Sequence, residues 1–375
     1  EGSFTSDNEF YNKLWQMSLR TLYVTMRDNY MDCPDRERAQ WWGDVTNEMM
    51  MMMYSLDEQS YQLYEKGLTS KLGFLDENTN VLQTVVPIQG DYFELPMQEL
   101  AGVCGYWEYY LYTGKTDILE MMYEPSKNYL NLWEMGDNGL VIHRGGSWDW
   151  PDWGSNSDVP ALENAWYYKA LTAVKQMAQE LGHDEDIPAM EERLLSIQMN
   201  YNSFWTEDGF KSTNQARPDD RANAVALLAG LVDKSQYPAV REVLNTVENA
   251  SPYMEKYVLD ALCEMGYMED AQDRMVRRYT PMVNDNYSTL WEVWDKNGGT
   301  RNHAWSGGPL ISMSKYMAGV APLSAGYDSY QVKPDLGELN QASVSVPSVK
   351  GDIVVDITRD PEAKTLSMNL VSPAE

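Results

Sequence analysis

The feature that most constrains the fold of this chain is the helical periodicity that continues through residues 8–317. Apolar residues recur there at spacings of three and four, and short polar segments interrupt them. We predict twelve helices, at residues 8–28, 36–55, 58–73, 95–113, 116–135, 160–181, 185–204, 221–231, 236–248, 253–265, 268–279 and 303–317. Because most connections are short, consecutive helices are expected to pair as antiparallel hairpins.

Residues at the ends of several predicted helices support these boundaries. Asp57 and Ser251 are suited to cap the helices that follow them, and Pro252 suits a first helical position. Gly114 and Gly182 stand where a helix is expected to stop.

Six hairpins can close into an (α/α)6 barrel, in which inner helices surround an axial pocket. The alternative is an open solenoid of the tetratricopeptide type, which requires a sequence pattern repeating at a fixed period. The hairpins here have unequal lengths, and the sequence contains no such repeat. We therefore predict an all-α (α/α)6 barrel over residues 1–320, with three long connections at 28–35, 136–159 and 280–302 as the places for function.

From about residue 318 the helical pattern ends and turn residues become frequent. Residues 342–349, 351–360 and 364–371 are predicted to be short strands. We interpret residues 321–375 as a linker and the start of a C-terminal β-sandwich domain. The chain begins at Glu1 without an initiator methionine, and we expect it to be a piece of a longer protein.

The charge and the aromatic residues narrow the class of ligand. A formal net charge of −28 argues against nucleic acid and anionic membranes as partners. No apolar run approaches the roughly 20 residues needed to cross a bilayer, so membrane insertion is excluded. The chain has 13 Trp and 25 Tyr against only 6 Phe, which favours a carbohydrate ligand because Trp and Tyr rings stack on sugars.

The three cysteines form no disulfide framework or CxxC pair. The compartment stays open, with a periplasmic or secreted location favoured over a cytoplasmic one.

The first segment with candidate chemistry is DNYMDCPDRERAQWWGD at residues 28–44. We expect a helix to start near Asp35, which places Glu37 in its first turn and Trp41 on the same face. Asp32 from the loop and Asp44 from the helix can approach the same place. A carboxyl group near an indole is poorly solvated, so its pKa rises and it becomes suited to donate a proton. A solvated helix start with arginine pairs is about equally compatible with the pattern.

The second segment is STLWEVWDKNGGTRNHAWSGGPL at residues 288–310. Glu292 stands between Trp291 and Trp294, and His303 follows a glycine-rich turn. A lone histidine is more often structural than catalytic. A carboxylate between indoles, however, is a costly structural choice unless it has a partner. We favour a functional interpretation of this segment.

The third segment, RGGSWDWPDWGSNSD at residues 144–158, alternates tryptophans with Asp149 and Asp152. It is interpreted as an aromatic wall of a pocket that includes Trp150, although an exposed loop with locally packed indoles is equally possible. A calcium site is less favoured, because the regular oxygen ligands of such loops are absent. The segment RPDDRAN at 217–223 is interpreted as a cap of the helix that starts near Arg221, and a pocket position for Asp220 or Arg221 is the less favoured alternative.

Several reaction classes lack their sequence motifs. The chain has no GxGxxG, P-loop, GxSxG or HExxH motif, so we expect no cofactor and no metal. Carboxylates and tryptophans on a helical barrel fit glycoside hydrolysis, in which one carboxylic acid protonates the leaving oxygen and another carboxylate activates water.

Three stretches resemble the α-L-rhamnosidases of glycoside hydrolase family 78. They are EGSFTSDNEFYNKLW at the start, DCPDRERAQWWGD at 32–44 and LWEVWDKNGGTRNHAW at 290–305. The family signature is Asp-Cys-Pro, then Arg-Glu-Arg, then Trp-x-Gly-Asp, and the resemblance covers nearly the whole chain. It implies an (α/α)6 catalytic barrel, an inverting mechanism and the exo-acting release of α-L-rhamnose. The chain departs from one common form of this signature at two points. The segment from Cys-Pro to Glu37 is one residue shorter, and Gln40 replaces a glycine.

The resemblance also implies roles for individual residues. Glu37 matches the general acid, and Glu292 matches the general base. The residues expected to contact the sugar are Asp32, Arg36, Trp41, Asp44, Trp291 and His303, with Asp149 and Trp150 matched more loosely. The implied partner is a rhamnose-containing carbohydrate, and the oligomeric state is open.

Two other interpretations remain at this point. One is another (α/α)6 glycosidase, such as an unsaturated glucuronyl hydrolase, which should show a cationic clamp for a sugar carboxylate, or a fucosidase. The other is a non-catalytic carbohydrate-binding helical protein, in which Glu37 and Glu292 would point to different surfaces. The inverting model predicts carboxyl groups about 6.5–9.5 Å apart, with Glu37 protonated and Glu292 ionised.

Overall fold

The computed structural model describes residues 1–88 and 93–373, and within them the chain forms twelve α-helices. These are α1 (Glu9–Thr25), α2 (Trp42–Ser55), α3 (Tyr61–Gly73), α4 (Pro96–Thr113), α5 (Thr116–Leu130), α6 (Val159–Leu181), α7 (Ile187–Asn200), α8 (Asp220–Leu228), α9 (Tyr237–Thr246), α10 (Pro252–Glu264), α11 (Met268–Val283) and α12 (Gly308–Ser312). A 3₁₀ turn (Ala304–Gly307) precedes α12, and a π-helical turn (Met313–Met317) follows it. The predicted helical character is confirmed. The largest boundary differences are at the start of α2, which begins at Trp42 and not at residue 36, and at the end of α5, which stops at Leu130 and not at residue 135.

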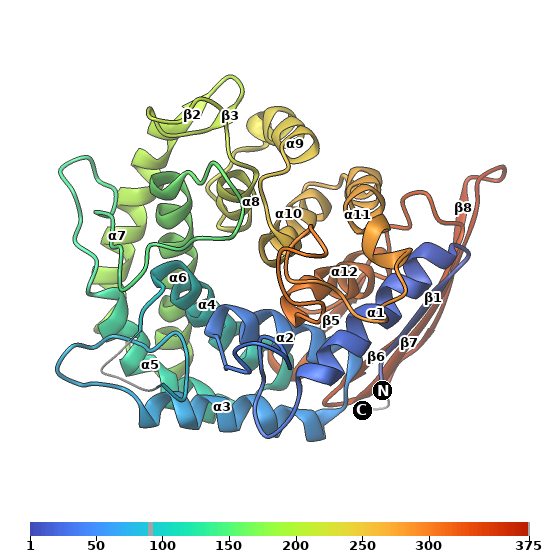
Figure 1. Ribbon diagram of the computed structural model, residues 1–375, viewed down its shortest axis with the longest axis horizontal. Coiled ribbons are helices and arrows are strands. Elements are labelled where there is room, and N and C mark those ends of the chain that lie inside the picture. Colours follow the sequence, from blue (N-terminus) through green and yellow to red (C-terminus); the bar gives the residue numbers. More distant parts are fainter. Residues whose placement is uncertain (89–92, 374–375) are drawn as a thin grey trace.

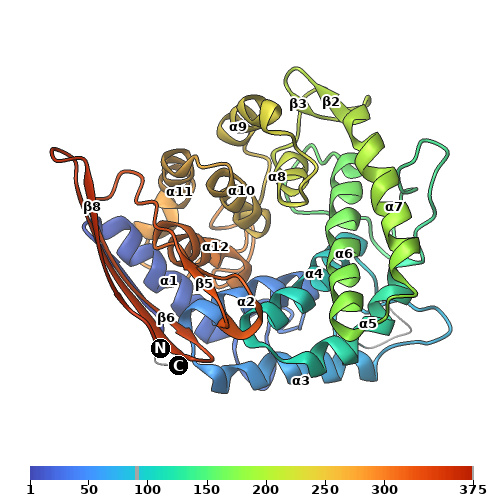
Figure 2. The same ribbon diagram turned by 180° about the vertical axis from the view of Figure 1, so that it is seen from behind.

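The even-numbered helices form a closed inner ring, in which each packs on the next and α12 packs on α2 (Figure 1). The odd-numbered helices lie outside this ring, as the view from behind also shows (Figure 2). Every residue of α2 is buried, including the methionines at 49–53, because this helix is covered on all sides. An inner helix needs such an apolar surface all round. The predicted (α/α)6 barrel is thereby confirmed.

The predicted helix ends are present. Ser251 Oγ accepts a hydrogen bond from the Tyr253 amide at the start of α10. Gly114 and Gly182 end α4 and α6 with φ values of 71° and 76°, a left-handed conformation that glycine adopts without strain.

A four-stranded antiparallel sheet packs beside α1 and α2. Its order is β1 (Ser3–Ser6), β6 (Gln341–Ser348), β7 (Gly351–Asp360) and β8 (Thr365–Val371). The three C-terminal strands confirm the prediction, whereas β1 was not predicted. It pairs with β6 so that Phe4 lies opposite Val344, and both side chains are buried. The domain boundary near residue 320 stays a prediction.

Two further pairs of short strands complete the secondary structure. They are β2 (Trp205–Thr206) with β3 (Gly209–Phe210), and β4 (Val320–Pro322) with β5 (Tyr330–Val332). Within the described residues, no helix has both the length and the apolar character needed to span a membrane.

Three connections that lead into inner helices contribute side chains to one pocket. They precede α2, α6 and α12, and they contain the three carboxylate- and tryptophan-rich segments singled out in the sequence. Because the inner helices run side by side in the same direction, these connections meet at the amino-terminal end of the ring.

Candidate active site

The pocket at this end of the ring has an empty volume of about 360 Å³, including the solvent space at its mouth. Its lining is dominated by carboxyl groups and indoles. The lining residues are Asp32, Arg36, Glu37, Trp41, Asp44, Leu95, Gln98, Trp148, Trp150, Trp153, Glu292, His303 and Trp305. Eight of the ten site residues proposed from the sequence are among them.

The segment carrying Glu37 is a loop, which corrects the predicted helix over 36–55. The helix begins at Trp42, and Arg38 has a φ of +54°, outside the right-handed helical region. The Asp32 amide donates to the Ala39 carbonyl at 2.9 Å, and the Ala39 amide donates to Asp32 Oδ1 at 2.8 Å. These bonds close the loop between them, so its peptide groups do not form helical bonds.

The loop is also held from the other side. The Trp42 amide donates to the Thr84 carbonyl at 2.7 Å, and the Val86 amide donates to the Gln40 carbonyl. The argument that Trp41 and Asp44 share a helical face with Glu37 is therefore wrong. All three nevertheless line the same pocket, because the loop folds back over the start of α2.

The pKa of Glu37 is shifted in the direction opposite to the one expected from the sequence. Burial alone would raise its pKa, but hydrogen bonds from Asp32 and Arg36 lower it below the ordinary value. Burial, followed by the contact with Glu37, raises the pKa of Asp32 to about 8. Asp32 Oδ2 is buried and has no donor among the described residues. The two pKa values are shifted in opposite directions, so Asp32 keeps its proton to higher pH than Glu37 does.

Glu292 lies in an irregular hairpin. Its amide donates to the Thr300 carbonyl at 2.9 Å, which sets the two residues opposite each other. Glu292 Oε2 accepts from the Thr300 amide at 2.8 Å and from the Thr300 hydroxyl at 3.0 Å. Gly299 leaves room for this carboxylate, since a Cβ on it would lie 2.7 Å from Glu292 Oε2.

The pKa of Glu292 lies below its ordinary value, in the direction expected for a base. Burial would raise this pKa, but the charge of His303, the Thr300 amide and Arg36 together lower it. Arg36 also joins the two halves of the site. Its Nε donates to Glu37 at 2.8 Å, and its Nη2 donates to Glu292 at 3.0 Å.

His303 is buried and links the hairpin to α2. Its Nε2 lies 2.9 Å from Asp44 Oδ1, and its Nδ1 lies 3.0 Å from the Thr300 hydroxyl. Burial would lower the pKa of His303, but the hydrogen bond and charge of Asp44, followed by the charges of Asp32 and Glu292, raise it. Burial raises the pKa of Asp44 despite the bond from His303.

The aromatic wall comes from two segments. Trp150 and Trp305 are stacked, with ring centroids 6.0 Å apart and planes inclined by 15°. Trp148 and Trp153 contact Trp150 and each other, and they are 43% and 46% exposed. The wall therefore has a buried inner part and an open rim.

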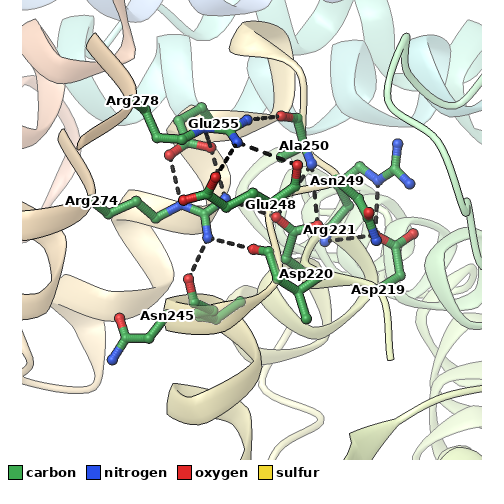
Figure 3. A network of polar contacts seen from close by, with 12 residues as sticks. Asp219, Asp220, Arg221, Asn245, Glu248, Asn249, Ala250, Glu255, Arg274 and Arg278 are labelled. Atoms are coloured by element: carbon green, nitrogen blue, oxygen red, sulfur yellow. Dashed lines mark hydrogen bonds and ion pairs between the residues drawn. The ribbon is translucent and has the colours of Figure 1, made fainter. Parts of the chain in front are cut away.

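A buried ionic network supports this wall from behind. Asp152 of the tryptophan segment accepts from Arg221 Nη1 at 3.1 Å, and Arg221 Nε donates to Asp219 at 2.9 Å. Figure 3 shows Arg221 beside Asp219, and Arg274 between Glu255 and Asp220. Asp219 caps α8, as expected for the RPDDRAN segment, and neither Asp220 nor Arg221 lines the pocket.

Two of the proposed residues are not among the pocket-lining side chains. Trp291 is buried with its ring 5.9 Å from the Lys296 ammonium, and Asp149 lies 3.2 Å from His143. Trp305, in the 3₁₀ turn that precedes α12, lines the pocket instead.

Sequence reasoning also missed Thr300, which holds Glu292, and Gln98, whose side chain accepts from the Gly43 amide. The glycine pair at 298–299 directly before Thr300 was the available signal for a close approach to Glu292. No local pattern distinguishes Gln98.

One group of side chains within the described residues has a metal-binding composition. The ligand atoms of Asp32, Cys33 and His303 lie within 4.8 Å of one another. Both ring nitrogens of His303 are already engaged, by Asp44 and by Thr300. This cluster is therefore organised for hydrogen bonding.

Comparisons with known proteins agree with one another. The model of the "bacterial alpha-L-rhamnosidase 6 hairpin glycosidase domain" matches residues 1–317. An alpha-L-rhamnosidase of Formosa agariphila is 23% identical over 418 residues, covering 99% of this chain and 43% of that protein. One from an Alteromonas species is 23% identical over 404 residues, covering 98% of this chain and 43% of its own length. The chain thus spans less than half the length of these curated relatives.

Solved structures share the fold. The family 78 rhamnosidase of Bacillus sp. GL1 superposes with a TM-score of 0.87 at 23% identity, covering 98% of this chain and 41% of its own. An alpha-L-rhamnosidase of Streptomyces avermitilis, complexed with L-rhamnose, gives 0.83 at 19% identity, covering 99% and 38%. A family 63 mannosylglycerate hydrolase of Thermus thermophilus gives 0.58 at 12% identity, covering 80% and 100%.

Proposed function

The chain belongs to the bacterial α-L-rhamnosidase family with a six-hairpin glycosidase domain, and from this premise we propose that it hydrolyses terminal α-L-rhamnosides with inversion. Glu37 is the general acid and Glu292 the general base. One observation carries the proposal: these two carboxylates, far apart in the sequence, contact the same Arg36 guanidinium in an aromatic pocket.

The proposed reaction follows from the two positions. Glu37 gives its proton to the glycosidic oxygen as the bond from that oxygen to the anomeric carbon breaks. Glu292 takes a proton from a water molecule that attacks the anomeric carbon from the opposite face. The products are the free alcohol and rhamnose of inverted configuration. With substrate bound, the two carboxyl groups are expected about 6.5–9.5 Å apart, leaving room for the water.

Because the pKa of Glu37 is lowered, its proton must be supplied before it can act as an acid. The adjacent Asp32, whose pKa is raised to about 8, is the group suited to supply it. Sugar hydroxyls that donate to the buried Asp32 Oδ2 would stabilise its ionised form. The proton then passes to Glu37, provided that Arg36 releases that carboxylate. Arg36 is able to move, since its side chain is 48% exposed.

The lining of the pocket favours a neutral deoxy sugar over a uronate. Among the described residues, Arg36 is the one arginine or lysine that lines the pocket, and two carboxylates already share it. A sugar carboxylate would meet Asp32, Asp44 and their neighbours without a free cationic clamp. The stacked Trp150 and Trp305 offer an apolar surface suited to the methyl and C–H groups of rhamnose.

The direct test is the hydrolysis of p-nitrophenyl α-L-rhamnoside by the 375-residue chain. Release of p-nitrophenol is expected for the wild type, with large losses for Glu37→Gln and Glu292→Gln. Glu191→Gln on α7 is the matched control, since its side chain is exposed and pairs with Lys175 far from the pocket. Absence of release by the folded wild type, or wild-type rates for both pocket variants, would contradict the proposal. The corresponding fucoside and an unsaturated glucuronide test the two related glycosidases.

A further inference from the structure

The support of Glu292 points to a residue with a role of its own. Thr300 bonds one oxygen of this carboxylate twice, through its amide at 2.8 Å and its hydroxyl at 3.0 Å. Thr300 is buried, and its hydroxyl also lies 3.0 Å from His303 Nδ1. The distance from His303 Nδ1 to Glu292 Oε2 is 3.7 Å, too long for a direct hydrogen bond. The hydroxyl is therefore the link between the ring and the carboxylate.

The direction of each hydrogen bond in this series follows from which groups can donate a proton and which can only accept one. An ionised Glu292 only accepts, so the single hydroxyl proton of Thr300 points to it. The Thr300 oxygen must then accept from His303, which makes Nδ1 a donor. Nε2 lies 2.9 Å from Asp44 Oδ1, and the hydrogen bond and charge of His303 favour the ionised form of Asp44 against the effect of its burial. An ionised Asp44 also only accepts. Both ring nitrogens thus carry protons, and His303 is a cation between two carboxylates.

The surrounding charges are consistent with this state. Asp32, Glu37 and Asp44 face the ring from the loop and from α2, and Glu292 faces it from the hairpin. Arg36 is the other cation at the site. Four carboxyl groups and two cations share this small volume, so a neutral His303 would leave Asp44 and Glu292 with less compensation.

We propose that Thr300 is a positioning residue that carries a hydrogen-bond relay from cationic His303 to Glu292, keeping this carboxylate ionised and correctly aimed. As a role in catalysis, the relay rests on the proposed function of Glu292 as the base. Its existence as a hydrogen-bonded chain does not depend on that function. The two parts can therefore be tested separately.

The kinetic test compares Thr300→Val, which removes the hydroxyl at similar volume, with Thr300→Ser, which retains it. We expect kcat to fall about 10- to 100-fold in Thr300→Val with KM changed only slightly, because a charge-assisted bond to the base is lost. The acidic limb of the kcat profile should move to higher pH, since the bond favours ionised Glu292. Thr300→Ser should restore most of both.

Thr289→Val is the matched control. Its hydroxyl donates to the Arg301 carbonyl in the same hairpin, so it reports on hairpin stability alone. An equal loss in Thr289→Val and Thr300→Val, or an unshifted pH profile in Thr300→Val, would overturn the inference while leaving the proposed function intact.

The spectroscopic test needs no activity. The chain has only three histidines, which makes the imidazole ¹⁵N signals of His303 assignable with a His303→Gln reference. We expect both ring nitrogens of His303 to be protonated at neutral pH in the wild type, and a lower pKa of this ring in Thr300→Val. An unprotonated nitrogen in the wild type would overturn the relay. Two protonated nitrogens in a protein that cleaves no rhamnoside would contradict the proposed function alone.

Discussion

The two halves of the pocket are built differently. The hairpin at 290–303 that carries the proposed base, here called the base hairpin, holds Glu292 buried. The Glu292 side chain is 3% exposed and accepts hydrogen bonds from Thr300 and Arg36. The loop at 32–41 that carries the proposed acid, here called the acid loop, leaves the Glu37 side chain 35% exposed. Beside it lies Asp32, whose pKa is raised and whose buried Oδ2 has no hydrogen-bond partner among the described residues. One carboxylate is buried and held by several donors, whereas the other lies on a more exposed loop and has Arg36 as its ion-pair partner.

This difference matches the two proposed tasks. A general base must be ionised and aimed at a water, which a rigid set of donors achieves in advance. A general acid must receive a proton and meet the leaving group, whose shape varies between substrates. An acid on a loop at the open side of the pocket, near the exposed Trp148 and Trp153, can adapt to that variation.

The largest expected effects distinguish acid from base by the leaving group. Glu292→Gln should lower kcat/KM roughly 10³- to 10⁴-fold for both p-nitrophenyl and alkyl α-L-rhamnosides, because both need an activated water. Glu37→Gln should lower it about 10²-fold for the p-nitrophenyl substrate and more for the alkyl one, which needs protonation to leave. The measurement is kcat/KM for the two substrates in each variant. Equal sensitivity of both variants to the leaving group would remove the assigned roles.

The second prediction concerns the guanidinium shared by both halves. Arg36→Met should reduce kcat/KM about 10- to 100-fold, and it should move the acidic limb upward, because Arg36 lowers the pKa of Glu292. A pH–rate profile measures both effects. Arg38→Met is the control on the same loop, since Arg38 donates to the Pro34 carbonyl. If the limb stays unchanged in Arg36→Met, Arg36 serves the acid loop alone.

A smaller effect is expected from crowding the base. In Gly299→Ala the new Cβ would lie 2.7 Å from Glu292 Oε2, and the carboxylate must shift from its place against Thr300. We expect kcat about 10-fold lower with the folded state retained. In the control Gly298→Ala, the Cβ meets Val293 Cγ2 at 2.9 Å, away from the carboxylate. Similar kinetics for the two alanine variants would argue against a tightly fixed base.

The smallest effect is on the pH dependence of stability at the acid loop. The pKa of Asp32 rises from 3.8 to about 8 on folding, so the native state binds more protons and stability falls as pH rises through this interval. The lowered pKa of Glu37 adds stability that is lost only at pH values near or below its ordinary 4.5. Asp32→Asn cannot titrate, so its Tm relative to wild type should rise by roughly 2–4 °C between pH 5 and pH 8. A difference in Tm that stays constant between pH 5 and pH 8 would show that Asp32 does not titrate in this interval.

Much of the fold could be predicted from the sequence because it depends on local patterns. The helical periodicity, the caps at Ser251 and Gly182, and the strands at the C-terminus each depend on residues close together in the chain. Strand β1 could not be predicted this way, since it is a strand only through pairing with β6.

In the candidate site too, the features that could not be predicted depend on contacts between residues far apart in the sequence. The carboxylates and most of the tryptophans could be identified by type, but the start of α2 depends on the tertiary bonds of the loop with Asp32 and Thr84. The lowered pKa of Glu37 depends on Asp32 and Arg36 reaching it in three dimensions. Likewise, Trp305 lines the pocket and Trp291 does not, which depends on how the hairpin and the 3₁₀ turn after it are folded.

The most direct test of the acid and base assignment is the anomeric configuration of the first product. Hydrolysis of p-nitrophenyl α-L-rhamnoside by the wild type is followed by ¹H NMR, before mutarotation equilibrates the sugar. An acid at Glu37 and a base at Glu292 acting across the sugar ring predict that β-L-rhamnose appears first and the α-anomer only later. Initial release of α-L-rhamnose would contradict the mechanism, because it requires a nucleophilic carboxylate about 5 Å from the acid.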